Sequence, residues 1–398
     1  MKFGVNMAKR VLSLFSGCGG LDLGFERAGF QTVAAFDADK AAVATFNENF
    51  GEKARVVDLS QPAAFPQDID VVIAGPPCQG FSTGSGYSKV DDPRNDLLAR
   101  TCDLISNIRP KAAVIENVSA LGNARNRPYL EYALFKLKEA GLNAELSVLN
   151  AEDFGVPQAR RRLIIVATRA TFGFNLSGVK RTPHFVLRDV LHDIGEGVQS
   201  HDPIPPRAGT KDYLIAKRIR QGQKLCNVRG GERSVHTWDI PEVFGSTTWA
   251  EKEVLLRLLR LRRTNRKRSF GDADPVSFDE IQSTFEQNID GQISALIGKG
   301  YVRKIEGFFD LTHTFNGKYK RLIWDDFAPT VDTRFGDIRL FLHPTENRGM
   351  TVREAARIQG FPDGFKFPTH KPTAFRLIGN AVPPPLAQNV AAFVREII

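Results

Sequence analysis

The sequence predicts an α/β protein built on a doubly wound, mostly parallel sheet, followed by a smaller and more basic domain. Short apolar runs alternate with segments of helical spacing from residue 10 to residue 169. Apolar strands that alternate with helices are typical of a parallel sheet covered on both faces. The alternation ends after Thr171, where Pro, Gly, Asp and His become frequent, and a basic helical segment begins near residue 250.

Hydrophobic periodicity predicts the elements of the first domain. Strands are expected at residues 10–15, 31–36, 54–60, 69–75, 111–118, 144–150 and 161–169. Helices are expected at residues 21–29, 39–50, 96–108 and 128–141. Glycine stands at the end of the first and the last of these helices, as is common at a helix C-terminus. Residues 172–206 are expected to form loop.

The second domain has a different pattern. A basic amphipathic helix is expected at residues 250–268, then two shorter helices at 277–285 and 290–300, then a β-hairpin within 301–324. Three helices followed by a hairpin are typical of a winged helix-turn-helix, in which Asp290 to Ser294 would begin the recognition helix. An ordinary α+β insert is the alternative.

The C-terminal part returns to α/β character, with helices expected at residues 351–361 and 382–397. Prolines stand at the start of the second helix, where they are tolerated. We therefore expect this last helix to pack back on the first domain. The predicted division is a first domain at 1–172, a second at 173–345, a hinge segment at 346–374 and a C-terminal helix at 375–398.

Composition narrows the class of protein. The net charge of +9 favours a polyanionic partner, although a surface of solvated lysines and arginines is the plainer interpretation. None of the four cysteines forms a CxxC pair, so no metal site and no disulfide framework are expected. No apolar run reaches the roughly 18 residues of a membrane span. These features predict a cytoplasmic protein that does not span a membrane.

A glycine-rich turn and two acids mark a candidate nucleoside site. The segment SGCGG, with Gly17 and Gly19, follows a strand and begins a helix, which suits close approach of an anionic ligand. Asp37 ends the second strand, where a ribose-binding carboxylate is found in doubly wound sheets. Asp58 follows the third and could accept a hydrogen bond from an adenine amino group. Helix capping is the alternative for each acid, and a dinucleotide and S-adenosylmethionine (AdoMet) remain equally possible at this point.

Three further groups are expected at the same sheet edge. Cys78 follows a buried strand between two prolines and a Gln-Gly turn, a setting that presents a thiol rather than burying it. Glu116 ends the next strand after an apolar run, and Arg160 and Arg162 precede another. A buried structural cysteine and a solvated charge run are the alternatives. Together these groups favour a nucleophilic thiol with an acid and cations beside it.

The chain resembles the bacterial DNA (cytosine-5)-methyltransferases. The blocks FSGCGGL, AFDAD, VVDLS, GPPCQGFS, ENV, QARRR, APTVDTR, REAARIQGFPD and IGNAVPP occur in the order of that family. The resemblance covers nearly the whole chain apart from roughly residues 172–320. Two departures are Ala38, where relatives often carry a bulkier residue that packs on adenine, and Leu377, where Gln is frequent.

The resemblance implies a reaction and a role for each matching residue. Cys78 would add to carbon 6 of a flipped cytosine, so that carbon 5 can take the methyl group of AdoMet, leaving S-adenosylhomocysteine. Glu116 would hold ring nitrogen 3 and the amino group, and Arg160 and Arg162 would bind the base oxygen and support the catalytic loop. The AdoMet contacts carried over are Phe15, Gly17, Gly19, Asp37, Asp58, Pro77, Leu97, Asn380 and Val382.

The resemblance also implies the partner. Residues 1–172 would be the catalytic AdoMet-binding domain and 173–345 the target-recognition domain for a specific double-stranded DNA sequence. DNA contacts are expected at Gln79, Ser82, Arg257, Arg260, Arg263, Arg266 and Lys267, with Arg262 and Arg268 on the same basic helix. We expect a monomer that is associated with the nucleoid. The sequence does not tell whether a cognate restriction endonuclease exists, and such a partner would act separately. No metal is expected.

Three rival functions are less well supported. Methylation of tRNA is known in one branch of the family, but the Cys-Phe-Thr element of that branch is missing from the variable region. A transcription factor with a degenerate enzyme domain conflicts with the intact PPC, ENV and QxRxR blocks. A NAD-dependent oxidoreductase conflicts with the glycine pattern and the thiol block.

Overall fold

The structure, a computed structural model, describes residues 8–77, 96–170, 173–195, 197–264, 266, 271 and 273–398. The predicted site residues Cys78, Gln79, Ser82 and Lys267 lie outside the described residues, as does Arg268. The chain divides into two compact units, which are described separately. Unit 1 comprises Met1–His201, Trp324–Arg334 and Thr351–Ile398, and unit 2 comprises Asp202–Ile323 and Phe335–Met350.

Unit 1 is organised around the predicted parallel sheet, which is confirmed. Its seven strands lie in the order β3-β2-β1-β4-β5-β8-β6. They are β1 (Lys9–Leu14), β2 (Phe30–Asp37), β3 (Ala54–Val56), β4 (Val71–Ala74), β5 (Ala112–Val118), β6 (Asn143–Asn150) and β8 (Arg161–Thr168). The pairs among β1 to β5 are parallel, and β8 pairs antiparallel with both β5 and β6. The order reverses between β1 and β4, the position at which doubly wound sheets bind ligands.

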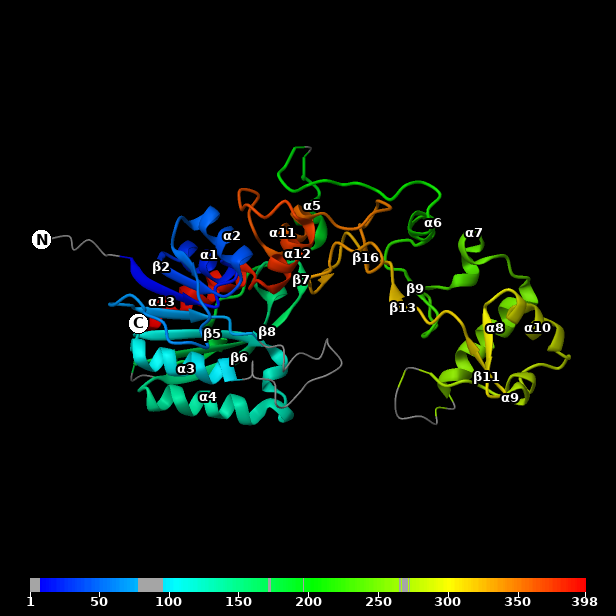
Figure 1. The fold of residues 1–398 in the computed structure, drawn as a ribbon, viewed down its shortest axis with the longest axis horizontal. Helices are drawn as coiled ribbons and strands as arrows, with labels where there is room; N and C mark the ends of the chain where they lie inside the picture. The colour runs from blue at the N-terminus through cyan, green and yellow to red at the C-terminus, as the bar shows by residue number, and fades with distance from the viewer. Residues whose placement is uncertain are drawn as a thin grey trace, which may run out of the picture. The chain divides into compact units, whose positions relative to one another are not determined.

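Helices cover both faces of this sheet (Figure 1). The helices α3 (Asp96–Ile108) and α4 (Arg127–Glu139) bury their apolar sides against one face, and α1 (Gly20–Arg27) and α13 (Pro384–Ile397) against the other. The helix α2 (Lys40–Phe50) packs on β2 and β3. Because both faces are buried, the strands are almost continuously apolar, and this is why the sequence predicts them well.

The C-terminal helix belongs to this unit because it packs on the first helix of the chain. A side chain at Gly24 on α1 would bring its Cβ within 2.3 Å of the Ala387 Cβ on α13, so only glycine permits this approach. Two shorter helices precede α13, namely α11 (Val352–Gln359) and α12 (Lys371–Asn380). The short strand β15 (Ala328–Pro329) pairs with β7 (Gln158–Ala159), and α5 is Leu187–Leu191.

The boundaries between the units differ from the predicted ones. Residues 173–201 pack with unit 1, although their Pro- and Gly-rich composition suggests the start of the second domain. Backbone hydrogen bonds explain this, since Leu187 donates to the Asp326 carbonyl and Arg353 donates to the Ser200 carbonyl, all within unit 1. The chain thus returns to unit 1 at Trp324–Arg334 before its C-terminal segment.

Unit 2 contains the elements of a winged helix. They are α8 (Trp249–Thr264), α9 (Phe278–Gln282), α10 (Asp290–Gly298) and the antiparallel hairpin of β11 (Val302–Ile305) and β12 (Phe308–Leu311). Val276, between α8 and α9, forms an antiparallel bridge with Phe309 on β12. Leu255, Ile281 and Ile293 come from the three helices and meet in one apolar cluster.

The remaining elements of unit 2 are small. A three-stranded sheet has the order β10 (Ser234–Val235), β9 (Lys224–Cys226) and β13 (Asn316–Lys318), and β14 (Lys320–Arg321) pairs with β16 (Phe341–Leu342). The other helices are α6 (Lys211–Arg218) and α7 (Pro241–Phe244). The expected hairpin within 301–324 is therefore confined to β11 and β12, because β13 pairs with β9 instead.

Two expectations about the basic helix are wrong. The helix α8 ends at Thr264 rather than at residue 268. Arg262 does not face solvent, because its side chain is buried and its Nε lies 2.5 Å from the Asp310 carboxylate of β12. It joins the helix to the hairpin and cannot belong to a phosphate-binding face. Across the described part of the chain, no helix has the length and apolar character needed to cross a membrane.

A buried carboxyl group on α1 makes the stability of unit 1 depend on pH. Asp22 accepts hydrogen bonds from Ser13 Oγ at 3.0 Å and Thr32 Oγ1 at 3.2 Å, and burial raises its pKa to about 7. The folded pKa exceeds that of the unfolded chain, so the folded state holds this proton more tightly. The stability that the protonated group contributes is therefore lost as the pH rises toward and through 7.

We expect Asp22→Asn to remove this loss. Relative to the parent chain, the free energy of unfolding of the variant should rise between about pH 5 and pH 8, by about 2–3 kcal/mol. Urea unfolding of both proteins at the two pH values measures the difference. A difference that is the same at both pH values would show that the pKa of Asp22 is not raised in the folded state.

Candidate active site

A cavity of about 550 Å³ lies in unit 1 where the carboxyl ends of β1, β2, β4 and β5 meet. It brings together most of the predicted unit 1 residues, and its lining includes Phe15, Gly17, Asp37, Asp58, Pro77, Leu97, Glu116, Arg160, Arg162 and Asn380. Gly19 and Val382 do not line it. A Cβ on Gly19 would clash with the Phe50 ring, and one on Gly20 would lie 2.4 Å from the Val382 carbonyl oxygen, so Val382 packs against the glycine turn.

The glycine turn is shaped to let a ligand approach its backbone. Phe15, which is not glycine, has a φ of 53°, and Gly17 has a φ of 55°, so the turn adopts the left-handed conformation at both positions. Such conformations cost about 1–3 kcal/mol outside glycine and are concentrated at functional sites. A Cβ on Gly17 would meet no atom within 4 Å, so this part of the turn faces open space.

Asp37 is fixed by the turn that it faces. Its Oδ2 accepts a hydrogen bond from the Gly17 amide and its Oδ1 from the Asp39 amide, each at 2.8 Å. Burial raises the pKa of this carboxyl, and the two amides act in the opposite direction. Each oxygen retains a lone pair, so Asp37 can still accept hydrogen bonds from a pair of hydroxyls. Asp58 is exposed at the same cavity, where a hydrogen bond from Ser60 lowers its pKa.

Glu116 and Arg162 form an ion pair on the cavity wall. Glu116 lies near the end of β5, and Arg162 lies near the start of the antiparallel strand β8, directly opposite Val118. The Arg162 Nε is 2.7 Å from the Glu116 Oε1, and the two side chains are only 15% and 12% exposed. The arginine thus holds the carboxylate in one orientation, and the second carboxylate oxygen accepts no hydrogen bond from the residues that the structure describes.

Arg160 is placed differently from Arg162. It is only 1% exposed, and its guanidinium donates hydrogen bonds to the carbonyls of Val331 at 3.0 Å and of Gly379 and Ala381 at 2.9 Å. These carbonyls belong to two segments far along the chain, and all three residues line the cavity. By this geometry, Arg160 holds two segments of the cavity wall in position, whereas Arg162 pairs with Glu116 on the cavity wall.

Two glutamines that the sequence analysis did not single out support the same wall. Gln158 accepts a hydrogen bond from the Val331 amide at 3.0 Å and donates to the Ile358 carbonyl at 3.2 Å. Gln359 donates to the carbonyls of Ile378 at 3.1 Å and Ala381 at 2.6 Å. Both glutamines are fully buried. Each lies in a recognised sequence block, but nothing in one sequence separates them from surface glutamines.

Arg376 is a further residue that sequence reasoning missed. It lies on α12, lines the cavity and forms an ion pair with Asp39, whose other oxygen caps α2 through the Ala41 amide. This pair connects the C-terminal block to the residue two positions after Asp37. A lone arginine and a lone aspartate 337 positions apart carry no pairing signal in a sequence.

The predicted DNA contacts that the structure describes lie in unit 2. Arg260 and Arg263 line a pocket on α8, whereas Arg257 is paired with Glu253 at 2.6 Å and stacked on the Phe285 ring at 4.1 Å. Arg266 lies beyond the end of α8. Among the residues that the structure describes, no group of three or more His, Cys, Asp or Glu side chains is placed to hold a metal ion.

The strand order and the cavity at its reversal point define the class of the protein as an AdoMet-dependent methyltransferase fold. Similar folds occur in solved structures. One is an Escherichia coli prophage protein described as a DNA modification methyltransferase, with a TM-score of 0.58 and 23% identity, covering 98% of this chain and 99% of that one. Another is the Schizosaccharomyces pombe Dnmt2 methyltransferase, with a TM-score of 0.52 and 17% identity over 98% of each chain.

The family follows from the sequence matches. The model of the C-5 cytosine-specific DNA methylase family matches residues 9–395, so the chain belongs to that family. A type II methyltransferase of Xanthomonas oryzae, M.XorII, is 32% identical over 97% of this chain and 84% of its own length. The type II methyltransferase M.HgiCII of Herpetosiphon aurantiacus is 30% identical over 95% of this chain and 94% of its own length. The predicted family is thus confirmed, and AdoMet is its cofactor.

We expect Arg160→Met to open the cavity wall. Three hydrogen bonds from a buried charged group are lost, so the free energy of unfolding should fall by at least about 3 kcal/mol. AdoMet affinity should fall with it, because Val331, Gly379 and Ala381 line the cavity. Urea unfolding and titration calorimetry with AdoMet measure the two effects.

The neighbouring Arg161 provides a matched control for this prediction, because it is exposed and is the first residue of β8, directly after Arg160. Arg161→Met should leave stability within about 0.5 kcal/mol of the parent chain. Equal effects of the two substitutions would contradict the positioning part assigned to Arg160.

Proposed function

We propose that the chain transfers the methyl group of AdoMet to carbon 5 of a cytosine in a specific double-stranded DNA sequence, through a covalent adduct with Cys78. The observation that carries the proposal is the Glu116–Arg162 pair, which shares one cavity with the Gly17–Asp37 contact and with Pro77. Cys78 follows Pro77 directly in the sequence. The candidate nucleoside site and the Glu116–Arg162 ion pair therefore lie in the same cavity as Pro77, the residue directly before Cys78.

The residues of the cavity fit AdoMet. Gly17 faces open space, Asp37 is a fixed acceptor for ribose hydroxyls, and the exposed Asp58 can accept a hydrogen bond from an adenine amino group. Phe15, Pro77 and Leu97 add apolar surface to the same cavity. Small-molecule sites are largely apolar, with a few polar groups that fix orientation, and this lining follows that rule. Bound AdoMet would supply an electrophilic methyl group.

Carbon 5 of cytosine is a weak nucleophile, and the residues of the site would change that. The Cys78 thiolate adds to carbon 6, which places electron density of the former double bond on carbon 5. Glu116 holds ring nitrogen 3 and the amino group, and this favours the addition. After carbon 5 has received the methyl group, it loses its proton, and the electron pair of that C–H bond expels the Cys78 thiolate. The products are 5-methylcytosine, S-adenosylhomocysteine, a proton and the Cys78 thiolate.

Arg162 would act on Glu116 and on the base together. Its Nε orients the Glu116 carboxylate, and its remaining guanidinium donors can bind the base oxygen. The target base must leave the helical stack before it can enter such a site, since carbon 6 is covered by its neighbours in a duplex. Extrusion requires a few kcal/mol, which contacts with the base and with the surrounding strand must offset.

Several finer proposals go with this function. Unit 2 would recognise the target sequence, as the predicted target-recognition domain. The type II methyltransferase names of the relatives support a role beside a restriction endonuclease that acts separately. We further propose that the enzyme works as a monomer on nucleoid DNA. Methylation of tRNA has less support, because the family that matches is one of DNA methylases.

The function is tested by incubating the purified chain with tritiated AdoMet and either genomic DNA or total tRNA, followed by bisulfite sequencing of the DNA. We expect label in DNA, and methylated cytosines confined to one short sequence. Label in tRNA alone would indicate that the chain methylates tRNA rather than DNA. No label in either nucleic acid would contradict the proposed methyltransferase activity.

Cys78→Ala should reduce methyl transfer to below about one-thousandth of the parent rate, because no covalent adduct can form. AdoMet affinity should remain, since Asp37 and Gly17 are untouched. Single-turnover transfer to labelled DNA and AdoMet calorimetry measure the two quantities. Substantial transfer by this variant would rule out the thiol as nucleophile.

Glu116→Gln should slow the chemical step by about 10²–10⁴-fold while DNA affinity is preserved. The amide keeps the shape of the side chain but cannot supply the proton or the negative charge that the addition uses. Single-turnover rates at saturating DNA isolate the chemical step. A parallel loss of DNA affinity and rate would instead indicate that Glu116 serves only in binding.

A further inference from the structure

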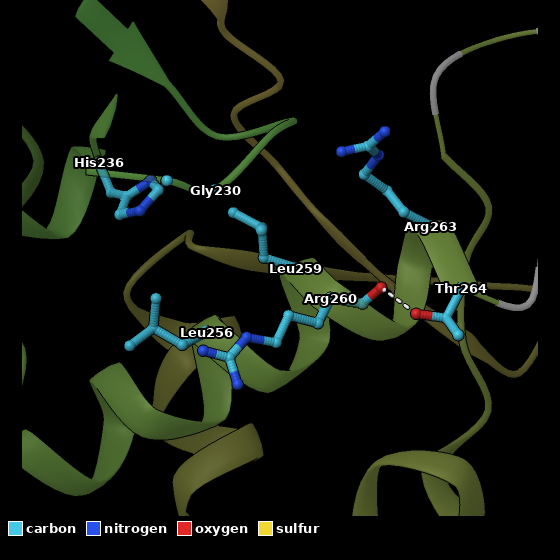
Figure 2. Close-up of a pocket in the computed structure, with 8 residues that line it drawn as sticks. Gly230, His236, Leu256, Leu259, Arg260, Arg263 and Thr264 are labelled. Atoms are coloured by element: carbon cyan, nitrogen blue, oxygen red, sulfur yellow. Dashed lines mark hydrogen bonds between the residues drawn. The ribbon is translucent and has the colours of Figure 1, made fainter. Parts of the chain in front are cut away.

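A second pocket, entirely within unit 2, has no part in the proposed chemistry. It has a volume of about 470 Å³ and lies between α8 and the loop that leads into Thr237. We refer to it as the α8 pocket, and its lining is Gly230, Gly231, His236, Leu256, Leu259, Arg260, Arg263 and Thr264. Figure 2 shows His236 and Gly230 on one side and the residues of α8 on the other.

His236 is held in one orientation on the pocket wall. Its side chain is nine-tenths buried, its ring stacks on Trp238 at 4.5 Å, and its Nδ1 lies 2.7 Å from the Cys226 carbonyl. A carbonyl oxygen can only accept, so Nδ1 carries the hydrogen. Burial lowers the pKa of this imidazole, which keeps the ring neutral near pH 7.

The other ring nitrogen is therefore a hydrogen-bond acceptor. Nε2 has no hydrogen-bond partner among the described residues, and it remains open to solvent where the ring lines the pocket. A ligand that covers this nitrogen without donating a hydrogen bond to it would lose about 1–3 kcal/mol. A ligand that fills the pocket is therefore favoured if it carries a hydrogen-bond donor for Nε2 of His236.

The opposite side of the pocket carries positive charge. Arg260 and Arg263 belong to its lining, and neither has an ion-pair partner in the part of the chain that the structure describes. By contrast, Arg257 and Arg262 on the same helix are each paired with a carboxylate. No acidic residue is among the eight that line the pocket. An anionic ligand is therefore favoured next to the donor that His236 requires.

Between these polar groups the pocket is lined by two leucines of α8, and the loop that contains Gly230 and Gly231 lies close to them. Leu256 is 38% exposed on α8, and Leu259 lies 3.5 Å from the position of a Cβ on Gly230. Gly231 has a φ of 132°, which side chains rarely adopt, so the loop depends on glycine here. A flat apolar group with an anion on one side and an amino group on the other matches this surface.

We propose that the α8 pocket receives one nucleotide of the DNA, with Arg260 and Arg263 at its phosphates and Nε2 of His236 accepting a hydrogen bond from the amino group of its base. The inference rests on the proposed function, in which DNA is the substrate. It makes His236 a specificity-determining residue, since thymine has no exocyclic amino group and adenine, cytosine and guanine do. The arginines contribute affinity that does not depend on sequence.

Base analogues that lack one amino group test the His236 contact. Once bisulfite sequencing of the parent enzyme gives the target sequence, duplexes are made in which purine replaces adenine, 2-pyrimidinone replaces cytosine or inosine replaces guanine, one position at a time. The parent enzyme should lose affinity roughly 5-fold or more at one position, where the acceptor is left unpaired. The variant His236→Asn should show no further loss at that same position.

His236→Asn is chosen because its amide can still donate to the Cys226 carbonyl while the acceptor at Nε2 is removed. His236→Phe, which keeps the stacking on Trp238, is a second variant with the same expected outcome. Melting temperature and AdoMet affinity verify that the variants fold. Equal losses in parent and variants at every position would overturn the inference, whereas a parent enzyme that methylates no DNA would overturn the proposed function instead.

Salt dependence tests the arginines. Arg260→Gln and Arg263→Gln should each reduce the slope of log affinity against log salt by about 0.9, the value for one phosphate contact. Arg257→Gln is the matched control on the same helix, and its ion pair with Glu253 predicts a nearly unchanged slope. Equal slopes for all three variants and the parent would contradict the phosphate contacts.

A free nucleotide is the rival occupant with the same chemistry. Deoxynucleoside monophosphates are titrated into the full chain and into His236→Asn by calorimetry. We expect weak binding or none, because one nucleotide lacks the contacts of a strand. Binding of a monophosphate that His236→Asn abolishes, with DNA affinity unaffected, would assign the pocket to a small molecule and overturn the inference.

Discussion

The candidate active site depends on the burial of one guanidinium. Arg160 stands immediately before β8, and its side chain binds carbonyls from two segments more than 170 positions away in the sequence. Because a buried cation must have partners, these carbonyls cannot separate from it without leaving a charge unpaired in the interior. The C-terminal block is thereby fixed as a wall of the cavity. Gln158 and Gln359 reinforce the same junction.

The direction of β8 has a chemical consequence. Parallel strands bring only their carboxyl ends to the cavity, but β8 is antiparallel and begins there. Its first residues therefore lie beside the last residues of β5, and this is why Arg162 reaches Glu116. The antiparallel strand β8 thus brings the cation Arg162 to a sheet edge that otherwise carries acidic side chains. In the proposed reaction, the carboxylate that Arg162 orients is the group that assists addition to the cytosine ring.

Much of this architecture could be predicted from the sequence, for a physical reason. Strands buried on both faces are nearly all apolar, so β1, β4 and β5 are visible in a single sequence, and the acids stand out because they interrupt such runs at their ends. The division into units could not be predicted, since residues 173–201 pack on unit 1 through backbone hydrogen bonds that leave no pattern. Nor could the burial of Arg262, whose partner Asp310 is 48 positions away. Charge alone does not separate a cation that faces a ligand from one that joins two elements.

The central claim is that Cys78 forms a bond with the target cytosine in the course of methyl transfer. Its most direct test is a duplex that carries 5-fluoro-2′-deoxycytidine at the target position, since fluorine cannot leave carbon 5 as a proton does and the adduct persists. With AdoMet present, we expect a protein–DNA complex that survives denaturation, and mass spectrometry of its peptides should place the nucleotide on Cys78. Methyl transfer to the normal duplex without any adduct on the fluorinated one, or an adduct on another residue, would contradict the account.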